Sequence, residues 1–265
     1  MRVFASLSAA SLALCSAGAA AAQPPPRRVA SLNLCTDELL LMLAAPRQIA
    51  SVTHLAQQRA ETPLWRQARR HRRNDGSLVS VAALKPDLVL TMGGGARDRG
   101  PIAARLRMRT LDLPYPQSIA DIERSVARVA AALGRGQAGR QMLARISSLK
   151  RTAPRRAMDA IWLGGGGRSV AATGLAAEWM RLAGMRQRPL KGDRISLEQL
   201  LVAPPALLLR SDYRAGQYSS EQRWLAHPLA ARAKASRTLA TDGRRWTCMG
   251  PLLADEILRL RKAAA

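Results

Sequence analysis

Side chains suited to catalysis are few and far apart in this chain of 265 residues. His54, His71 and His227 show none of the short spacings that zinc-binding histidines use. Cys35 lies at the predicted start of a helix, where a thiolate is stabilised, but no motif places a histidine beside it. The glycine run 164–167 lacks the lysine and hydroxyl residue of a nucleotide-binding loop. The sequence therefore predicts no metal site and no catalytic residue, with a cysteine-dependent enzyme as a minor alternative.

The N-terminus has the pattern of a secretory signal peptide. Arg2 supplies a positive charge, a short apolar core follows, and Ala19–Ala22 offers small residues for cleavage. Cleavage near Ala22 is favoured over a lipoprotein signal, because the residue before Cys15 is leucine rather than a small residue. Residues 1–22 are therefore interpreted as a signal peptide, and the mature chain as an exported, periplasmic protein.

Two cysteines, Cys35 and Cys248, remain in the mature chain. In an oxidising compartment they either form a disulfide or stand apart as small apolar side chains, and the sequence leaves both open. A disulfide between them would close a very long loop, which the chain-entropy model values at about 4–5 kcal/mol.

The chain is strongly basic, with 42 lysines and arginines against 18 acidic residues and a formal net charge of +24. The arginines are spread over the whole chain and aromatic residues are only 3%, which argues against nucleic-acid binding. The densest run, Arg66–Arg73, is interpreted as a solvated helix face. Two explanations of the surplus remain: a general preference for surface arginine, or attraction to an anionic ligand or membrane surface.

Short apolar strands alternate with helices in both halves of the mature chain, a pattern typical of parallel sheets. Ligands of such sheets lie beyond the carboxyl ends of the strands. In the first half, the strand ends are followed by Asn33–Thr36, Thr53–His54, Gly93–Ala96 and Tyr115. In the second half, they are followed by Gly164–Arg168, Gly174, Ser211–Tyr213 and Trp246.

A helical stretch separates the two halves. Ser118 and Asp121 form a capping-box pattern, apolar residues recur at helical spacing to Lys150, and Gly134 and Gly136 interrupt them. We therefore expect an N-terminal α/β lobe, a stiff helical bridge and a C-terminal α/β lobe, at residues 23–117, 118–151 and 152–265.

Four segments, in this order, resemble the periplasmic binding proteins of ABC importers for iron complexes and cobalamin. They are RRVASLNLCTDELLLMLAAPRQIASVTHLA, SVAALKPDLVLTMGGG, RISLEQLLVAPPALLL and WTCMGP. The resemblance covers nearly the whole mature chain. It implies a class III fold, in which two lobes with mainly parallel sheets flanked by helices are bridged by a long α-helix. The ligand lies in the cleft between the lobes, which close only slightly around it.

The same resemblance implies a function. The ligand would be a ferric siderophore, haem or cobalamin, no catalytic cofactor is expected, and the chain would act as a monomer without nucleic acid. Its partners would be an ABC permease and its ATPase at the inner membrane. A periplasmic sensor or scaffold of the same fold, without transport, is the main alternative.

The resemblance and the strand-end positions together give an expected ligand-binding set. Asn33 and Thr36 match the first-strand loop of the family, and His54 stands where members often place a ligand contact. Tyr115, Trp162 and Trp246 offer flat apolar area to a macrocycle, although core packing explains a tryptophan equally well. The full set is Asn33, Thr36, His54, Gly94, Tyr115, Trp162, Gly174, Tyr213 and Trp246.

Docking on the permease uses one surface glutamate on each lobe in this family. Glu198, in the segment SLEQLL, matches the second of the pair. The first falls on Val79, and Asp75, four residues earlier, is the alternative acid. The resemblance therefore predicts docking through Glu198 and leaves the N-terminal half of the scheme open.

Overall fold

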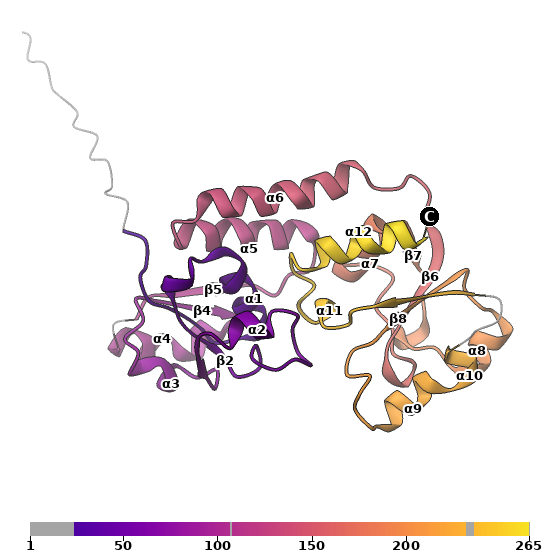
Figure 1. Ribbon diagram of the computed structural model, residues 1–265, viewed down its shortest axis with the longest axis horizontal. Coiled ribbons are helices and arrows are strands. Elements are labelled where there is room, and N and C mark those ends of the chain that lie inside the picture. The colour runs from indigo at the N-terminus through magenta and orange to yellow at the C-terminus, as the bar shows by residue number, and fades with distance from the viewer. Residues whose placement is uncertain (1–23, 107, 232–235, 265) are drawn as a thin grey trace, which may run out of the picture.

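The computed structural model describes residues 24–106, 108–231 and 236–264, as two lobes side by side beneath a pair of helices (Figure 1). The predicted signal peptide lies outside the described residues. The predicted fold class, two α/β lobes with parallel sheets joined by helices, is confirmed. Among the described helices, none is long and apolar enough to cross a membrane.

The N-terminal lobe is built on a five-stranded parallel sheet with the strand order β3-β2-β1-β4-β5. Its strands are β1 (Val29–Ser31), β2 (Ile49–Thr53), β3 (Arg72–Asn74), β4 (Leu88–Met92) and β5 (Thr110–Leu113). Its helices are α1 (Leu34–Leu43), α2 (Trp65–Ala68), α3 (Leu78–Ala82) and α4 (Gly95–Arg105). The interior strand β4 is wholly buried, as expected for an apolar strand covered on both faces.

The C-terminal lobe has a four-stranded parallel sheet with the strand order β7-β6-β8-β9. Its strands are β6 (Met158–Leu163), β7 (Met185–Gln187), β8 (Leu207–Ser211) and β9 (Arg237–Thr241). Its helices are α7 (Leu175–Leu182), α8 (Leu197–Val202), α9 (Ser220–Ala226), α10 (Pro228–Ala231), α11 (Arg245–Cys248) and α12 (Leu253–Ala264).

The bridge is two helices rather than one continuous helix. α5 (Ile119–Ala132) and α6 (Gly136–Arg151) fold back on each other, because Gly134 turns the chain with a positive φ of 66°. The two helices pack closely: a Cβ added at Gly139 would lie 2.5 Å from the Cβ of Ala130. The glycines that interrupt the sequence pattern therefore make a helical hairpin.

α6 spans both lobes (Figure 1). At its start, the Arg135 side chain donates to the carbonyl of Leu43 in the N-terminal lobe, at 3.2 Å. At its end, Arg261 of α12 donates to the carbonyl of Leu149, at 2.6 Å. α5 also reaches both lobes: the N–H of Ile119 at its start donates to Glu178 of α7 at 2.7 Å, and Gln48 of the N-terminal lobe donates to the carbonyl of Leu133 at its end. Both helices of the hairpin therefore link the lobes.

One hydrophobic core runs through both lobes. It continues from the buried α1 and β4 through α5 and α6 to α7 and α12, and includes Leu40, Leu90, Val126, Ile146, Trp179 and Leu260. Separating the lobes along this shared core would expose apolar surface to water, which costs free energy. The shared core therefore resists large changes in the angle between the lobes.

The arginine run 66–73 departs from the prediction. Instead of a helix face, it forms the four-residue helix α2 and then the edge strand β3. Pairing with β2, in the register Ser51 to Arg72 and Thr53 to Asn74, outweighs the weak strand signal of a charged segment.

Candidate functional site

The strand-end loops of the two lobes meet across a cleft. The buried Glu61, in the loop after β2, accepts hydrogen bonds from the hydroxyl of Tyr213 at 2.9 Å and from Arg214 at 2.7 Å, both in the loop after β8. Beside them, Arg244 donates to the carbonyl of Arg59 at 3.0 Å. The carboxyl ends of the two sheets therefore face one another, which is where parallel sheets bind ligands.

A cavity of about 610 Å³ opens at the strand ends of the C-terminal lobe. Its size lies within the usual range for sites of drug-sized ligands, roughly 300–1,000 Å³. It is lined by Trp162, Gly164, Gly165, Arg168, Ser169, Val170, Ser211, Tyr213, Arg214, Gln217, Ser219, Glu221 and Gln222. The lining combines one indole and one phenol ring with many hydrogen-bonding groups, so the cavity suits a ligand with an apolar face and polar edges.

Trp162 is held in place by its own backbone. Its N–H donates to the side-chain oxygen of Gln187 at 2.9 Å, and its carbonyl accepts from the Ser169 hydroxyl at 2.6 Å. Its ring lies 6.1 Å from that of Trp246, centre to centre, in a tilted arrangement. The buried indole nitrogen of Trp162 has no hydrogen-bond partner among the described residues, which is uncommon for a buried donor.

Charge at the mouth of the cavity is paired. Arg168 lies 3.2 Å from Glu221, and both side chains are exposed. Partial burial, together with the hydrogen bond and charge of Glu61, raises the pKa of Tyr213, so its hydroxyl stays protonated at neutral pH. The Tyr213 hydroxyl therefore donates to Glu61, and its ring remains available to the cavity.

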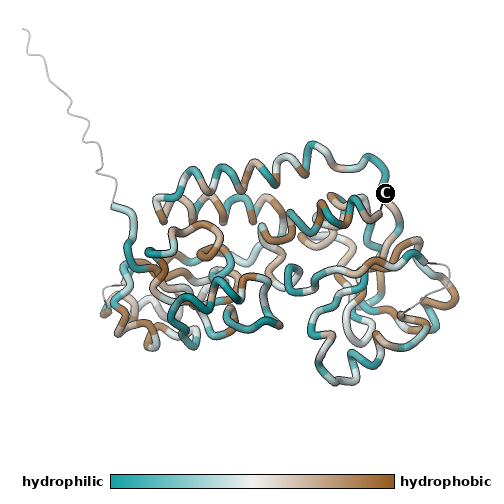
Figure 2. Tube along the Cα trace, in the orientation of Figure 1, coloured by the Kyte–Doolittle hydropathy of each residue, from teal (hydrophilic) through white to brown (hydrophobic). Residues whose placement is uncertain are grey.

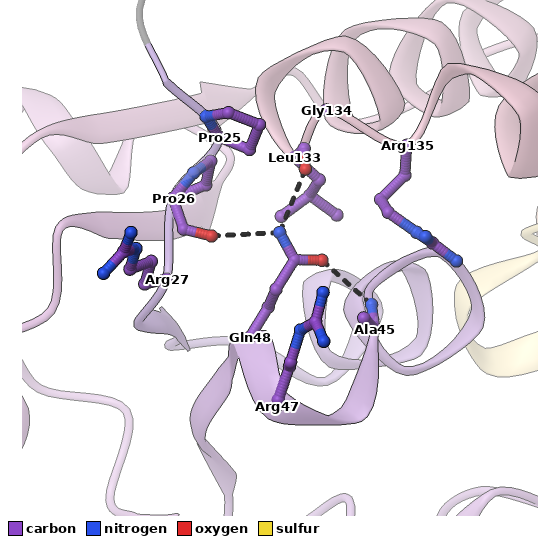
Figure 3. Close-up of a pocket in the computed structure, with 9 residues that line it drawn as sticks. All are labelled: Pro25, Pro26, Arg27, Ala45, Arg47, Gln48, Leu133, Gly134 and Arg135. Carbon is purple, nitrogen blue, oxygen red and sulfur yellow. Dashed lines mark hydrogen bonds between the residues drawn. The ribbon is translucent and has the colours of Figure 1, made fainter.

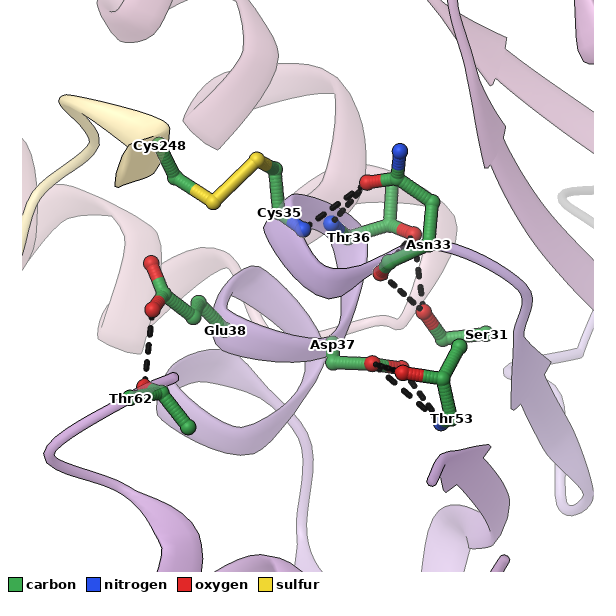
Figure 4. Close-up of a disulfide and its surroundings, with 9 residues drawn as sticks. All are labelled: Ser31, Asn33, Cys35, Thr36, Asp37, Glu38, Thr53, Thr62 and Cys248. Atoms are coloured by element: carbon green, nitrogen blue, oxygen red, sulfur yellow. Dashed lines mark hydrogen bonds between the residues drawn. A yellow bond between two sulfur atoms is a disulfide. The ribbon is translucent and has the colours of Figure 1, made fainter. Parts of the chain in front are cut away.

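The N-terminal lobe brings four of the expected ligand contacts to its strand ends. Asn33 caps α1, accepting from the N–H groups of Cys35 and Thr36, while its amide nitrogen points away from the helix (Figure 4). His54 is exposed, and the N–H of Gly94 donates to the Asp112 carboxylate at 3.0 Å. The 61% exposed Tyr115 covers Gly93, where any side chain would overlap the phenol ring.

Two members of the expected set are buried instead. Thr36 is fully buried, and its hydroxyl is hydrogen-bonded to Ser31 and to the carbonyl of Asn33. Trp246 is only 3% exposed and donates to the Thr241 hydroxyl at 2.8 Å. Both follow strand ends but point into a lobe, so neither side chain offers surface to a ligand. Gly174, with φ of 81°, is exposed beside the carbonyl of Gln117.

Comparison with known proteins decides the family. A family model described as periplasmic binding protein matches residues 29–239. This chain belongs to the periplasmic binding protein family. No curated protein sequence matches it.

Solved structures share the fold of this binding protein at low sequence identity. A siderophore-binding protein BauB, bound to ferric iron and two acinetobactin molecules, is 16% identical with a TM-score of 0.70, covering 92% of this chain and 94% of its own. The vitamin B12-binding protein BtuF of Vibrio cholerae is 17% identical with a TM-score of 0.61, covering 90% and 96%. The haem-binding protein BhuT is 18% identical with a TM-score of 0.62, covering 91% and 100%.

A disulfide joins the lobes of the binding protein beside the cleft (Figure 4). It links Cys35, in the first turn of α1, to Cys248, at the end of α11, with 5.3 Å between their Cα atoms. The lobes are therefore tied covalently at the disulfide and by hydrogen bonds at Glu61.

Two buried carboxyl groups lie on α1 near the disulfide (Figure 4). Burial raises the pKa of Asp37 to about 7, although hydrogen bonds from Thr53 oppose it. Burial and the neighbouring Asp37 raise the pKa of Glu38 to about 8, against a hydrogen bond from Thr62 at 2.7 Å. Among the described residues, no group of histidine, cysteine and acidic side chains is placed to hold a metal ion.

A second hollow, also of about 610 Å³, lies at the amino end of the N-terminal sheet (Figure 3). There the Gln48 amide donates to the carbonyls of Pro26 and Leu133, which joins the lead-in to β1 with the end of α5. This hollow lies at the wrong edge of the sheet for a ligand of a parallel α/β lobe. We therefore take the cavity at Trp162 as the candidate site.

Sequence reasoning missed several residues of the site. Arg214, Gln217 and Glu221 follow β8 but carry no motif, and only the preceding segment Ser211–Tyr213 was expected. Glu61 gave no signal, because its partners lie more than 150 residues away in the chain.

Proposed function

We propose that this protein is a periplasmic solute-binding protein that captures a metal chelate or corrinoid between its lobes and delivers it to an ABC permease with its ATPase. The observation that carries the proposal is the cavity at Trp162, whose lining residues Tyr213 and Arg214 contact Glu61 of the other lobe. The chain works here by binding, without chemistry and as a monomer.

The ligand class rests on the shape of the site and on the relatives. Proteins of this fold bind a ferric siderophore, vitamin B12 or haem, each a large ligand with apolar and polar parts. A molybdate-binding protein shares the fold too, with a TM-score of 0.66. A cavity of about 610 Å³ with two aromatic rings suits the larger ligands better than a small oxyanion.

The proposed ligand contacts come from both lobes. The N-terminal lobe offers Asn33, His54, Gly94 and Tyr115, and the C-terminal lobe offers Trp162, Gly174 and Tyr213, with Arg168 and Arg214 added at the mouth of the cavity. Asn33 and His54 would supply hydrogen bonds, and the aromatic residues would supply flat apolar area.

Docking on the permease is proposed to use Glu198. It lies in the first turn of α8, exposed to solvent, and a hydrogen bond with Ser196 lowers its pKa, so it is ionised at neutral pH. On the same helix, Leu201 and Val202 are 65% and 83% exposed. An exposed charge beside exposed apolar side chains is typical of a protein-binding surface.

Tryptophan fluorescence titration tests the proposal. The panel comprises ferric siderophores, haem, cobalamins and, as a small oxyanion, molybdate, with free tryptophan as the control for light absorption by the ligand. We expect a saturable change with one of the large ligands, because Trp162 lines the cavity. Trp162→Phe should remove most of that change, whereas Trp65→Phe, outside the cavity, should leave it. No saturable signal with any member would contradict the proposal.

A further inference from the structure

The segment 65–73 forms a strongly basic surface on one edge of the N-terminal lobe. Five arginines lie on α2, on β3 and between them, and all five are exposed: Arg66, Arg69, Arg70, Arg72 and Arg73. Among the described residues, none of the five has an ion pair with an acidic side chain. We call this group the α2–β3 basic surface; Figure 2 shows this part of the tube as hydrophilic.

The basic surface has an aromatic centre. Trp65 is half-buried, and the guanidinium groups of Arg66 and Arg69 lie 4.9 and 5.3 Å from the centre of its ring. Tryptophan and arginine together suit the interface of a bilayer, where the ring enters the headgroup region and the cations meet lipid phosphates.

Neither packing nor edge protection accounts for five unpaired arginines. β3 is an edge strand, where charged side chains prevent edge-to-edge pairing, but only Arg72 and Arg73 of the five lie on it. The nearest acid along the chain, Asp75, accepts instead from the N–H of Ser77 at 2.8 Å. The charge is therefore available to an anionic partner outside the molecule.

We propose that the α2–β3 basic surface binds the anionic lipid headgroups of a membrane. This contact goes beyond the proposed docking through Glu198, because it needs neither permease nor cargo. It would hold the protein near the bilayer and reduce the search for the permease to two dimensions. Each arginine near an anionic membrane strengthens binding roughly fivefold, so five are enough for weak, reversible attachment.

Co-sedimentation of the exported protein with vesicles tests the proposal. The vesicles contain phosphatidylcholine, with or without about one third phosphatidylglycerol, which sets the surface charge. We expect binding only to the anionic vesicles and release at about 0.5 M salt, where screening is strong. Changing Arg69, Arg70, Arg72 and Arg73 to Glu should reduce binding at least about tenfold.

A matched control separates this surface from the net charge of the chain. Arg140, Arg145, Arg155 and Arg156 are exposed on α6 and the loop after it, on the opposite side of the molecule in Figure 1. Their change to Glu alters the net charge equally, and we expect binding within about twofold of the parent protein. If both variants lose binding alike, or if the parent binds no anionic vesicle, the proposal is wrong.

The folding of the variants is checked by their thermal unfolding. If the fourfold variant unfolds early, Arg69→Gln with Arg70→Gln replaces it, since both side chains are solvent-exposed. That pair should still reduce binding several-fold. Because the vesicles contain no permease and no ligand, this result is independent of the titration that tests the proposed function.

Discussion

Residues 77–90 and 196–209 form the same unit in the two lobes. Ser77 and Ser196 each cap a short helix, α3 or α8, by accepting a hydrogen bond from the backbone three residues later. A proline, Pro86 or Pro205, then precedes the interior strand β4 or β8. Aligned residue by residue, the units differ at several positions, among them the second helical position, which is Val79 in one lobe and Glu198 in the other.

The N-terminal lobe differs from its counterpart by an additional segment. Between β2 and α3 it inserts residues 54–77 with α2 and β3, whereas the C-terminal lobe connects β7 to α8 by residues 188–196. The inserted segment carries Glu61, which links the lobes, and the α2–β3 basic surface. The repeated units form part of the scaffold, and the additional segment carries contacts that the C-terminal lobe does not have at the equivalent place.

The largest effect is expected at the position where one repeated unit has Glu198 and the other has Val79. Glu198→Lys should reduce uptake of the ligand roughly a hundredfold, because reversing the charge of Glu198 replaces attraction at the docking contact by repulsion. The affinity of the protein for the ligand should stay unchanged. Val79→Lys, at the equivalent position, should reduce uptake far less, because no acidic contact is lost there. Uptake in cells and ligand titration of the purified variants measure the two effects. Equal losses of uptake for the two variants would mean that docking depends equally on the two positions.

The repeat also explains how much the sequence could predict. Local signals are strong in these units: a serine cap, a proline and an apolar strand predict their elements without any knowledge of the partner strands. The charged strand β3 has no such signal, since its pairing with β2 decides its conformation. Thr36 and Trp246 show a second limit: their positions after strands were predicted, but whether each side chain points inward depends on packing.

The second effect concerns the contact between the lobes. Glu61→Ala should lower the free energy of unfolding by about 1–2 kcal/mol, because it leaves Tyr213 and Arg214 without their acceptor. Glu221→Ala removes the exposed pair with Arg168 inside one lobe and should change that free energy by less than about 0.5 kcal/mol. Denaturant unfolding measures both. Similar values would show that Glu61 is no stronger a link than a surface ion pair.

A third effect compares two buried glutamates, one in each lobe. Glu38 on α1 and Glu256 on α12 both accept from a threonine hydroxyl, at 2.7 and 2.6 Å. Burial raises the pKa of Glu38 to about 8. Burial acts on Glu256 in the same direction, but hydrogen bonds from Arg259 and Thr241 outweigh it and lower its pKa. The adjacent arginine thus reverses the direction of the shift.

Opposite pKa shifts predict that the two glutamates make stability depend on pH in opposite directions. The raised pKa of Glu38 contributes stability that is complete below about pH 4.5, its unfolded value, and is lost as pH rises towards about 8. Glu38→Gln keeps an acceptor for Thr62 and removes this loss, so its stability relative to the parent should increase by at least about 1 kcal/mol from pH 5 to 8.

Glu256→Gln is the matched variant in the other lobe. The lowered pKa of Glu256 contributes stability above its unfolded value that is lost in acid, so this variant should be less stable than the parent near neutral pH. The difference should shrink as the pH falls below about 4.5. Denaturant unfolding of both variants across this range measures the slopes. If the stability differences of the two variants changed with pH in the same direction, the charge of Arg259 would not set the ionisation state of Glu256. The contrast between the lobes would then not extend to their buried acids.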